Sequence, residues 1–139
     1  MDDRIIAIID DDALVRDSVT RLIRSMGYRA EKFSSTEELL AAGSLRDTCC
    51  IISDVTSADG TTSRLQDLVA STGCDIPIIF MTGRLNPAMK MMLMAAGAVH
   101  VLAKPFNQSD IAFHIAAALQ RQHRNTSRAN RARAVAEVA

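Results

Sequence analysis

A small set of polar residues in this sequence has the side chains that phosphoryl chemistry requires. Asp10 and Asp11 follow one short apolar run, and Asp54 follows another. Three carboxylates that meet repel one another unless a cation joins them. Mg²⁺ is suited to this position, because it takes oxygen ligands and bridges carboxylates to phosphoryl oxygens. A carboxylate in such a site can act as a nucleophile and form an aspartyl-phosphate.

Thr82 and Lys104 close two further apolar runs and supply the remaining groups. Phosphoryl transfer depends on positioning and on neutralising charge at the equatorial oxygens. The ammonium of Lys104 is a point charge for that purpose, and the Thr82 hydroxyl can reach a phosphoryl oxygen. Each residue alone is weak evidence, since aspartates after strands are common helix N-caps. We expect Asp12 to be only such a cap.

The apolar runs that precede these residues alternate with segments of helical periodicity. Capping residues and glycines mark the helix ends, including a capping box at residues 35–38 and glycine stops. We expect strands at residues 4–9, 28–33, 48–53, 76–81 and 99–103, and helices at residues 12–26, 35–43, 61–72, 87–96 and from 107 past 119.

Strands that alternate with helices predict a parallel sheet covered on both faces, with right-handed crossovers. Such sheets bind ligands at the carboxyl ends of their strands. We therefore expect the chemically capable residues to meet on one edge of the sheet: Asp10, Asp11, Asp54, Thr82 and Lys104.

Length and composition predict a single soluble domain. The chain has 139 residues, of which 48% are hydrophobic and 23% charged, with zero net charge. A neutral molecule gives no argument for a polyanionic partner, and no apolar run is long enough to span a membrane. Cys49, Cys50 and Cys74 form no C-x-x-C pair. They are typical of small buried side chains in a reducing cytoplasm.

The sequence resembles the receiver domains of two-component response regulators, and within them the FixJ-like group. The resemblance covers about residues 4–121. It implies an α/β, doubly wound, flavodoxin-like fold with a five-stranded parallel sheet in the order 2-1-3-4-5. A receiver domain would occupy residues 1–124, and residues 125–139 would form a basic helical linker or tail. The matching motifs are IIDDDALVR at 8–16, CIISDV at 50–55, IIFMTG at 78–83, AGAV at 96–99 and KPF at 104–106.

The resemblance also implies a role for each matching residue. Asp54 would accept phosphate from a sensor histidine kinase in a Mg²⁺-dependent reaction, so the chain would be a signalling domain and not an enzyme. Thr82 would be the switch hydroxyl, and Lys104 would bind the phosphoryl group through a cis Lys104–Pro105 peptide. The metal ligands would be Asp10, Asp11, Asp54 and the backbone carbonyl of Thr56.

Phosphorylation in this family remodels one face of the domain. Here that face is formed by the helix 87–96, the strand 99–103 and the last helix. The expected consequence is a homodimer, or control of transcription through a DNA-binding output domain that this chain does not contain. Met89, Met91, Met92 and Met94 surround the helix 87–96. They indicate either an adaptable binding surface or two or three core residues with the rest incidental.

Two departures from the family pattern leave an alternative open. The segment 56–62 lacks the usual proline and a glycine, which changes the backbone freedom of the loop after Asp54. Val101 stands where the family usually has a Phe or Tyr that moves with the switch hydroxyl. The alternative is therefore a pseudo-receiver that binds partners without phosphate.

A second alternative is an aspartyl-nucleophile phosphatase, in which Asp10 of the Asp10–Asp12 run would be the nucleophile. That class requires Thr or Val two residues after the second aspartate, where this chain has Leu14. It usually also has a cap and a longer chain. The histidines at 100, 114 and 123 show no metal-ligand spacing and are expected on the surface or in packing contacts.

Overall fold

The computed structural model describes residues 4–55, 61–73 and 75–121. All the predicted strands and helices are present, with ends shifted by at most a few residues. A short 3₁₀ turn at Leu45–Asp47 was not predicted. The elements are β1 (Ile5–Ile9), α1 (Ala13–Ser25), β2 (Arg29–Phe33), α2 (Thr36–Ala41), β3 (Thr48–Asp54), α3 (Thr61–Ser71), β4 (Ile78–Thr82), α4 (Pro87–Ala95), β5 (His100–Ala103) and a helix over 108–121.

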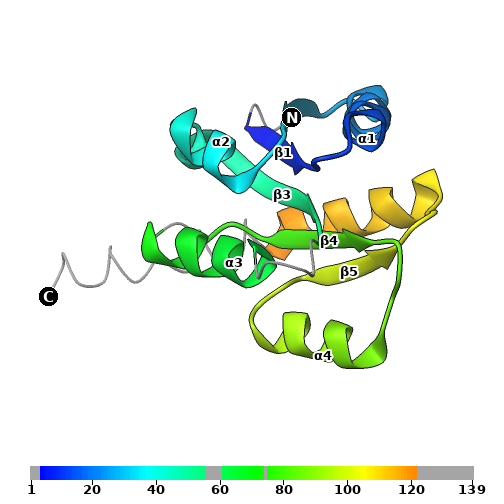
Figure 1. Cartoon of the computed structure of the whole chain (residues 1–139). Coiled ribbons are helices and arrows are strands. Elements are labelled where there is room, and N and C mark those ends of the chain that lie inside the picture. The colour runs from blue at the N-terminus through cyan, green and yellow to red at the C-terminus, as the bar shows by residue number, and fades with distance from the viewer. Residues whose placement is uncertain (1–3, 56–60, 74, 122–139) are drawn as a thin grey trace, which may run out of the picture.

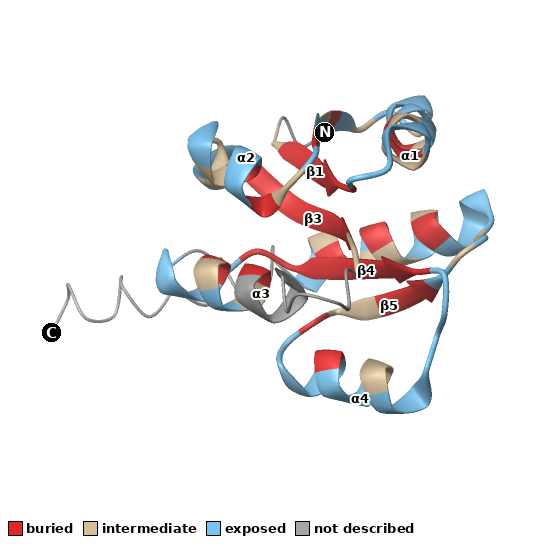
Figure 2. Cartoon of the chain, viewed as in Figure 1, coloured by how far each residue is buried: buried red, intermediate tan, exposed pale blue. Residues whose placement is uncertain are grey.

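The strands form one parallel sheet in the order β2-β1-β3-β4-β5, as expected (Figure 1). The topological switch point lies between β1 and β3, because β2 is added on one side of β1 and the later strands on the other. Ligand sites form at this point in doubly wound sheets. Every residue of β1 and β4 is buried (Figure 2). Continuous burial is typical of parallel strands covered on both faces.

Two apolar cores lie on the two faces of the sheet. One core packs Ile6 and Ile8 of β1 against α1 and the helix 108–121, through residues such as Ile23 and Ile115. The other core packs the alternate β1 residues against α2, α3 and α4, through residues such as Leu65. The period of two along β1 thus assigns neighbouring residues to opposite faces.

The helix caps follow the predicted residues, with one difference. The Asp12 carboxylate accepts from the backbone N–H of Leu14 at 3.0 Å, which confirms its N-cap role. Ser35 accepts from the Glu38 N–H at 3.1 Å. The capping box was expected to return the Glu38 carboxylate to the N-cap N–H, but this carboxylate accepts from the preceding Ser34 N–H at 2.9 Å.

The two described cysteines, Cys49 and Cys50, are buried, as expected, and Cys74 lies outside the described residues. Burial raises the pKa of the Cys50 thiol, which keeps it protonated and unreactive. Within the described ranges, no helix combines the length and apolarity needed to cross a bilayer. On α4, Met89 packs against the core, whereas Met91, Met92 and Met94 are exposed.

Candidate functional site

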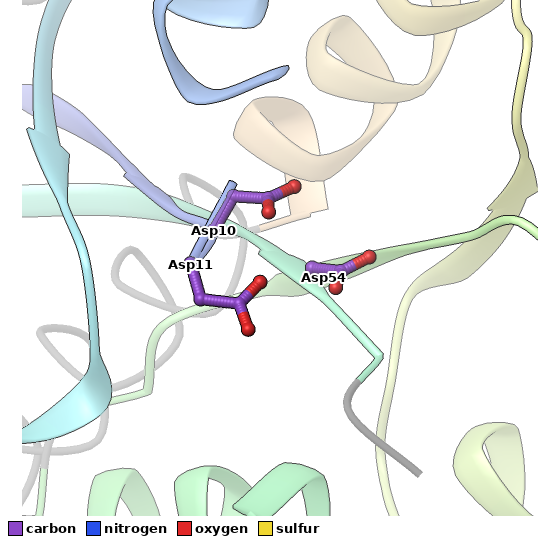
Figure 3. A group of neighbouring side chains, drawn as sticks. All are labelled: Asp10, Asp11 and Asp54. Atoms are coloured by element: carbon purple, nitrogen blue, oxygen red, sulfur yellow. The ribbon is translucent and has the colours of Figure 1, made fainter. Parts of the chain in front are cut away.

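Three carboxylates meet at the carboxyl edge of the sheet. Asp10 and Asp11 directly follow β1, and Asp54 is the last residue of the neighbouring strand β3. One carboxylate oxygen of each lies within 4.8 Å of the others, and Figure 3 shows the three side chains directed toward a common space. The predicted convergence of these residues is therefore present.

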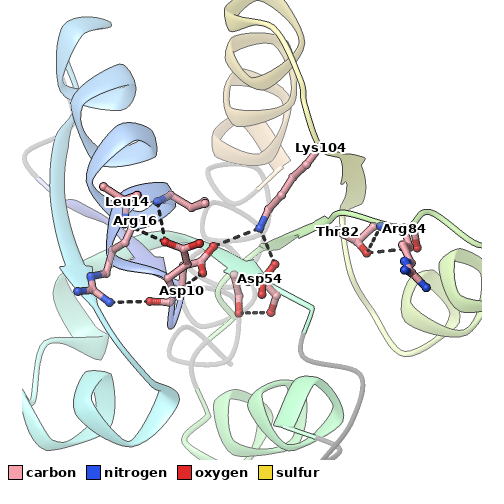
Figure 4. Close-up of polar contacts among 10 residues, drawn as sticks. Asp10, Leu14, Arg16, Asp54, Thr82, Arg84 and Lys104 are labelled. Atoms are coloured by element: carbon pink, nitrogen blue, oxygen red, sulfur yellow. Dashed lines mark hydrogen bonds and ion pairs between the residues drawn. The ribbon is translucent and has the colours of Figure 1, made fainter.

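Lys104, which directly follows β5, joins this group. Its ammonium lies 2.7 Å from Asp54 Oδ1 and 3.3 Å from Asp10 Oδ2 (Figure 4). The Lys104–Pro105 peptide is cis, as expected. Burial by itself would lower the pKa of Lys104, but the hydrogen bonds and charges of Asp54 and Asp10 together outweigh it and raise that pKa. The side chain is thus held as an ammonium beside the carboxylates.

Asp10 is the most buried of the three aspartates, with 2% of its surface exposed. Burial raises the pKa of its carboxyl, and the charge of Asp54 raises it further. The Asp12 N–H, which donates to Asp10 Oδ1 at 2.9 Å, and the charge of Lys104 oppose that rise. The Asp10 carboxylate is therefore held in position by the Asp12 N–H, and nearby cations favour its charged form.

Arg16 contributes to the site in a way that sequence reasoning missed. Its guanidinium donates to the Asp10 backbone carbonyl at 2.8 Å, which ties the first turn of α1 to the end of β1 (Figure 4). This bond fixes the backbone that carries Asp10 and Asp11. Arg16 stood within a family motif, but nothing in its type or spacing indicated a bond to a backbone carbonyl.

The carboxylates fit a hard divalent cation. Asp11 is exposed, Asp54 is half-buried and Asp10 is buried, so the oxygens of the group face a space that solvent reaches. Oxygen donors with room for water are what Mg²⁺ prefers. The fourth expected ligand, the Thr56 carbonyl, and most of the altered loop lie outside the described residues.

Thr82 lies at the same edge but is not in direct contact with the carboxylates. It is the last residue of β4, and its hydroxyl bonds to Arg84, accepting from the backbone N–H at 3.2 Å. The backbone N–H of Lys104 donates to the Thr82 carbonyl at 2.7 Å. Thr82 is thus joined to Lys104 through the backbone while its hydroxyl faces the β4–α4 connection (Figure 4).

Comparison with known proteins decides the family. The sequence model of the response regulator receiver domain family matches residues 6–116. The chain belongs to the response regulator receiver domain family. This receiver domain is part of a two-component system, and its FixJ-like resemblance is confirmed by relatives that include the transcriptional regulatory protein FixJ of Azorhizobium caulinodans.

Two relatives show the extent of the similarity. Nodulation protein W of Bradyrhizobium diazoefficiens is 32% identical over 120 residues, which cover 86% of this chain and 53% of that protein. The response regulator protein TodT of Pseudomonas putida is 34% identical over 133 residues, covering 94% of this chain and 59% of that protein. The receiver domain therefore spans somewhat over half the length of these relatives.

Solved structures confirm the fold. The crystal structure of FixJ-N matches with a TM-score of 0.76 and 29% identity, covering 86% of this chain and 96% of that one. The structure of the response regulator StyR matches with a TM-score of 0.81 and 26% identity, covering 94% of this chain and 67% of that one. TodT and StyR are response regulators by name, in agreement with the family that the chain matches.

Proposed function

We propose that Asp54 of this receiver domain accepts a phosphoryl group from a sensor histidine kinase in a Mg²⁺-dependent reaction. The observation that carries the proposal is the contact between Asp54 and the Lys104 ammonium at 2.7 Å, beside two further carboxylates. Asp54 is more accessible than the buried Asp10 while sharing the same cation. An accessible carboxylate next to a positive charge is the arrangement that an aspartyl-phosphate needs.

The reaction is a displacement at phosphorus. A carboxylate oxygen of Asp54 forms a bond to phosphorus as the bond between phosphorus and the kinase imidazole nitrogen breaks, and the imidazole leaves with that electron pair. Lys104 then pairs with a phosphoryl oxygen in place of the carboxylate. Asp10, Asp11, Asp54 and the Thr56 carbonyl would hold Mg²⁺, which would supply positive charge to offset that of the phosphoryl oxygens.

We propose that the signal is read through Thr82 and the face formed by α4, β5 and the helix 108–121. The phosphoryl group gives the Thr82 hydroxyl a stronger acceptor than the Arg84 backbone, to which it now bonds at 3.3 Å. Movement of Thr82 would shift the β4–α4 connection and the exposed side chains of Met91, Met92 and Phe113. A homodimer through this face, or control of a DNA-binding output domain, would follow.

A pseudo-receiver remains a second candidate because of Val101. This side chain is 2% exposed and packs in the α2–α4 core, so it cannot swing between buried and exposed positions as an aromatic residue would. If the chain is a pseudo-receiver, Asp54 would not accept a phosphoryl group. The phosphatase alternative is disfavoured, because its nucleophile would be the nearly inaccessible Asp10, held by Lys104 and the Asp12 N–H.

The proposal is tested by intact-mass measurement after incubation with a small phosphodonor and Mg²⁺. The native chain should gain the mass of one phosphoryl group, and chelation of Mg²⁺ should prevent the gain. Asp54→Asn should abolish it, whereas Asp47→Asn, which makes the same change at an exposed aspartate away from the site, should leave it intact. No gain in the native chain would favour the pseudo-receiver, and gain that depends on Asp10 alone would favour the phosphatase.

A further inference from the structure

The outer side of α4 exposes three thioether groups within about one turn. Met91, Met92 and Met94 are 73%, 60% and 38% exposed, and they make up half of the six large apolar side chains that are exposed in the described part of the chain. Figure 2 shows that most of α4 is open to solvent. Small oxidants in solution can reach such sulfur atoms, whereas they cannot reach a methionine in the core.

The other sulfur atoms of the described residues are shielded. Met81 on β4 is 0% exposed, and both Cys49 and Cys50 on β3 are buried. Met26 and Met89 are partly buried, and each packs against one of the two apolar cores. Because oxidation of sulfur follows its accessibility, a small oxidant should react on the outer side of α4 before it reacts at any of these five positions.

The attachment of α4 to the core does not depend on the three exposed methionines. Leu93 is 2% exposed and packs in the core together with Met89. The start of the helix is fixed by Asn86, whose side chain accepts from the Ala88 N–H at 2.8 Å. Oxidation of the outer methionines should therefore leave the helix in place and change only the polarity of its exposed surface.

We propose that Met91, Met92 and Met94 form an oxidation site at which a peroxide converts thioethers to sulfoxides. A sulfur lone pair attacks one oxygen of hydrogen peroxide, the O–O bond breaks, and the departing hydroxide takes the proton from the transferred oxygen and leaves as water. The sulfur is oxidised by two electrons and the peroxide is reduced. The sulfoxide oxygen is a polar acceptor that an apolar contact does not satisfy, so oxidation disrupts binding through the outer side of α4.

Sulfoxides at this site regulate the homodimer proposed for the face that contains α4. This part of the inference rests on the proposed function of that face. Phosphoryl transfer and oxidation use different groups, since the first takes place at Asp54 on the carboxyl edge of the sheet and the second on the exposed side of a helix. Peroxide should therefore block the dimer while Asp54 still accepts a phosphoryl group.

Peptide mapping by mass spectrometry after timed exposure of the full chain to hydrogen peroxide tests the oxidation site. We expect sulfoxide first at Met91 and Met92 and then at Met94, with Met26 and Met81 unmodified, an unchanged circular dichroism spectrum, and reversal by methionine sulfoxide reductase. In urea the methionines should all react alike. Sulfoxide at Met26 or Met81 as early as at Met91 in the folded chain would overturn the proposal, because the structure would then give no selectivity.

Sedimentation with beryllofluoride as the phosphoryl analogue tests the regulation, in a thiol reductant that reverses disulfides but leaves sulfoxides intact. The dimer of the native chain should be lost after peroxide treatment and restored by the reductase. A variant that combines Met91→Leu, Met92→Leu and Met94→Leu, which nearly conserves volume, should give the same dimer fraction before and after peroxide. An oxidised native chain that dimerises as well as the untreated chain would overturn the regulation. A native chain that forms no dimer before peroxide would contradict the proposed function of the face and its regulation together, while the peptide map still decides the oxidation site.

Discussion

Lys104 Nζ lies 2.7 Å from Asp54 Oδ1, and this contact connects the ends of two strands that are not neighbours in the sheet. The side chain of Lys104 is 25% exposed and that of Asp54 is 19% exposed. A second ion pair, between Lys32 and Asp17, has nearly the same length of 2.8 Å but is about half exposed at both ends. Because the two ion pairs have nearly equal lengths but differ in exposure, a comparison of their contributions to stability isolates the effect of burial.

Lys104→Met should destabilise the protein far more than Lys32→Met. Removal of Lys104 leaves three carboxylates without a cation, and loss of a charge-assisted hydrogen bond in a partly buried site costs about 1.5–3 kcal/mol. Loss of the exposed pair should cost at most about 1 kcal/mol. Urea unfolding without Mg²⁺ measures both. Equal effects would show that the contact of Lys104 with Asp54 is no stronger than a surface pair.

Asp10→Asn should stabilise the protein at neutral pH. Burial raises the pKa of the Asp10 carboxyl in the folded state above its ordinary value of 3.8. A raised pKa means that the stability contributed by the protonated form is complete below 3.8 and is lost as pH rises through the folded pKa. The stabilisation by asparagine should therefore be present at pH 7 and disappear below 3.8.

Urea unfolding of Asp10→Asn and the native chain at pH 7 and at acid pH checks this expectation, with Asp47→Asn as an exposed control. Addition of Mg²⁺ should narrow the difference by stabilising the native chain alone. A neutral-pH stability below that of the native chain would show that pairing with Lys104, and not burial, dominates the energetics of Asp10.

The stacked imidazoles of His100 and His114 predict a loss of stability on mild acidification. Their ring centroids are 3.5 Å apart, and they join β5 to the helix 108–121. Burial lowers the pKa of both rings, the charge of Lys90 on α4 adds to this, and the charge of Asp110 opposes it. A lowered pKa leaves the stability complete above 6.5 and removes it as pH falls toward the folded values.

His114→Phe tests this expectation, because it keeps a stacked ring and removes one titrating group. The native chain should lose stability between about pH 7 and pH 5 as its histidines protonate, and the variant should lose less. Thermal unfolding across this range, with His100 and His114 followed by NMR, provides the measurement. Parallel pH curves for the two proteins would contradict a role for the stack.

Thr82→Val should separate phosphorylation from its consequence. The substitution keeps the shape of the side chain and removes the hydroxyl that now bonds to Arg84. We expect Asp54 to accept phosphate in this variant, while the phosphorylation-dependent dimer fails to form; Thr82→Ser should preserve both. Sedimentation with and without a phosphoryl analogue reports the dimer. A Thr82→Val dimer equal to that of the native chain would exclude the hydroxyl as the switch.

The sequence predicted the strand order through the family resemblance and predicted the convergence of Asp10, Asp11, Asp54 and Lys104 through a general rule for parallel sheets. It could do so because the carboxyl ends of parallel strands share one edge. The sequence did not predict how these side chains are oriented, because a strand-end position does not determine the rotamer of a side chain. The direction of the Thr82 hydroxyl therefore emerged only from the structure.

Features that depend on side-chain contacts between separate elements were also not predictable. The Arg16 bond to the Asp10 carbonyl and the His100–His114 stack each join residues whose types and spacing carry no such signal. The buried face of α4 could not be predicted for a similar reason, because four methionines around one helix do not indicate which side faces the core. Of these four methionines, the structure places Met89 against the core and leaves the other three exposed.

The most direct measurement identifies which residue carries the phosphoryl group. After incubation with a small phosphodonor and Mg²⁺, the acyl phosphate is reduced with borohydride, which converts the modified aspartate to homoserine, and the peptides are mapped by mass spectrometry. We predict homoserine at position 54 and nowhere else in the chain. Homoserine at position 10, or an unmodified chain under conditions that phosphorylate a control receiver domain, would contradict it.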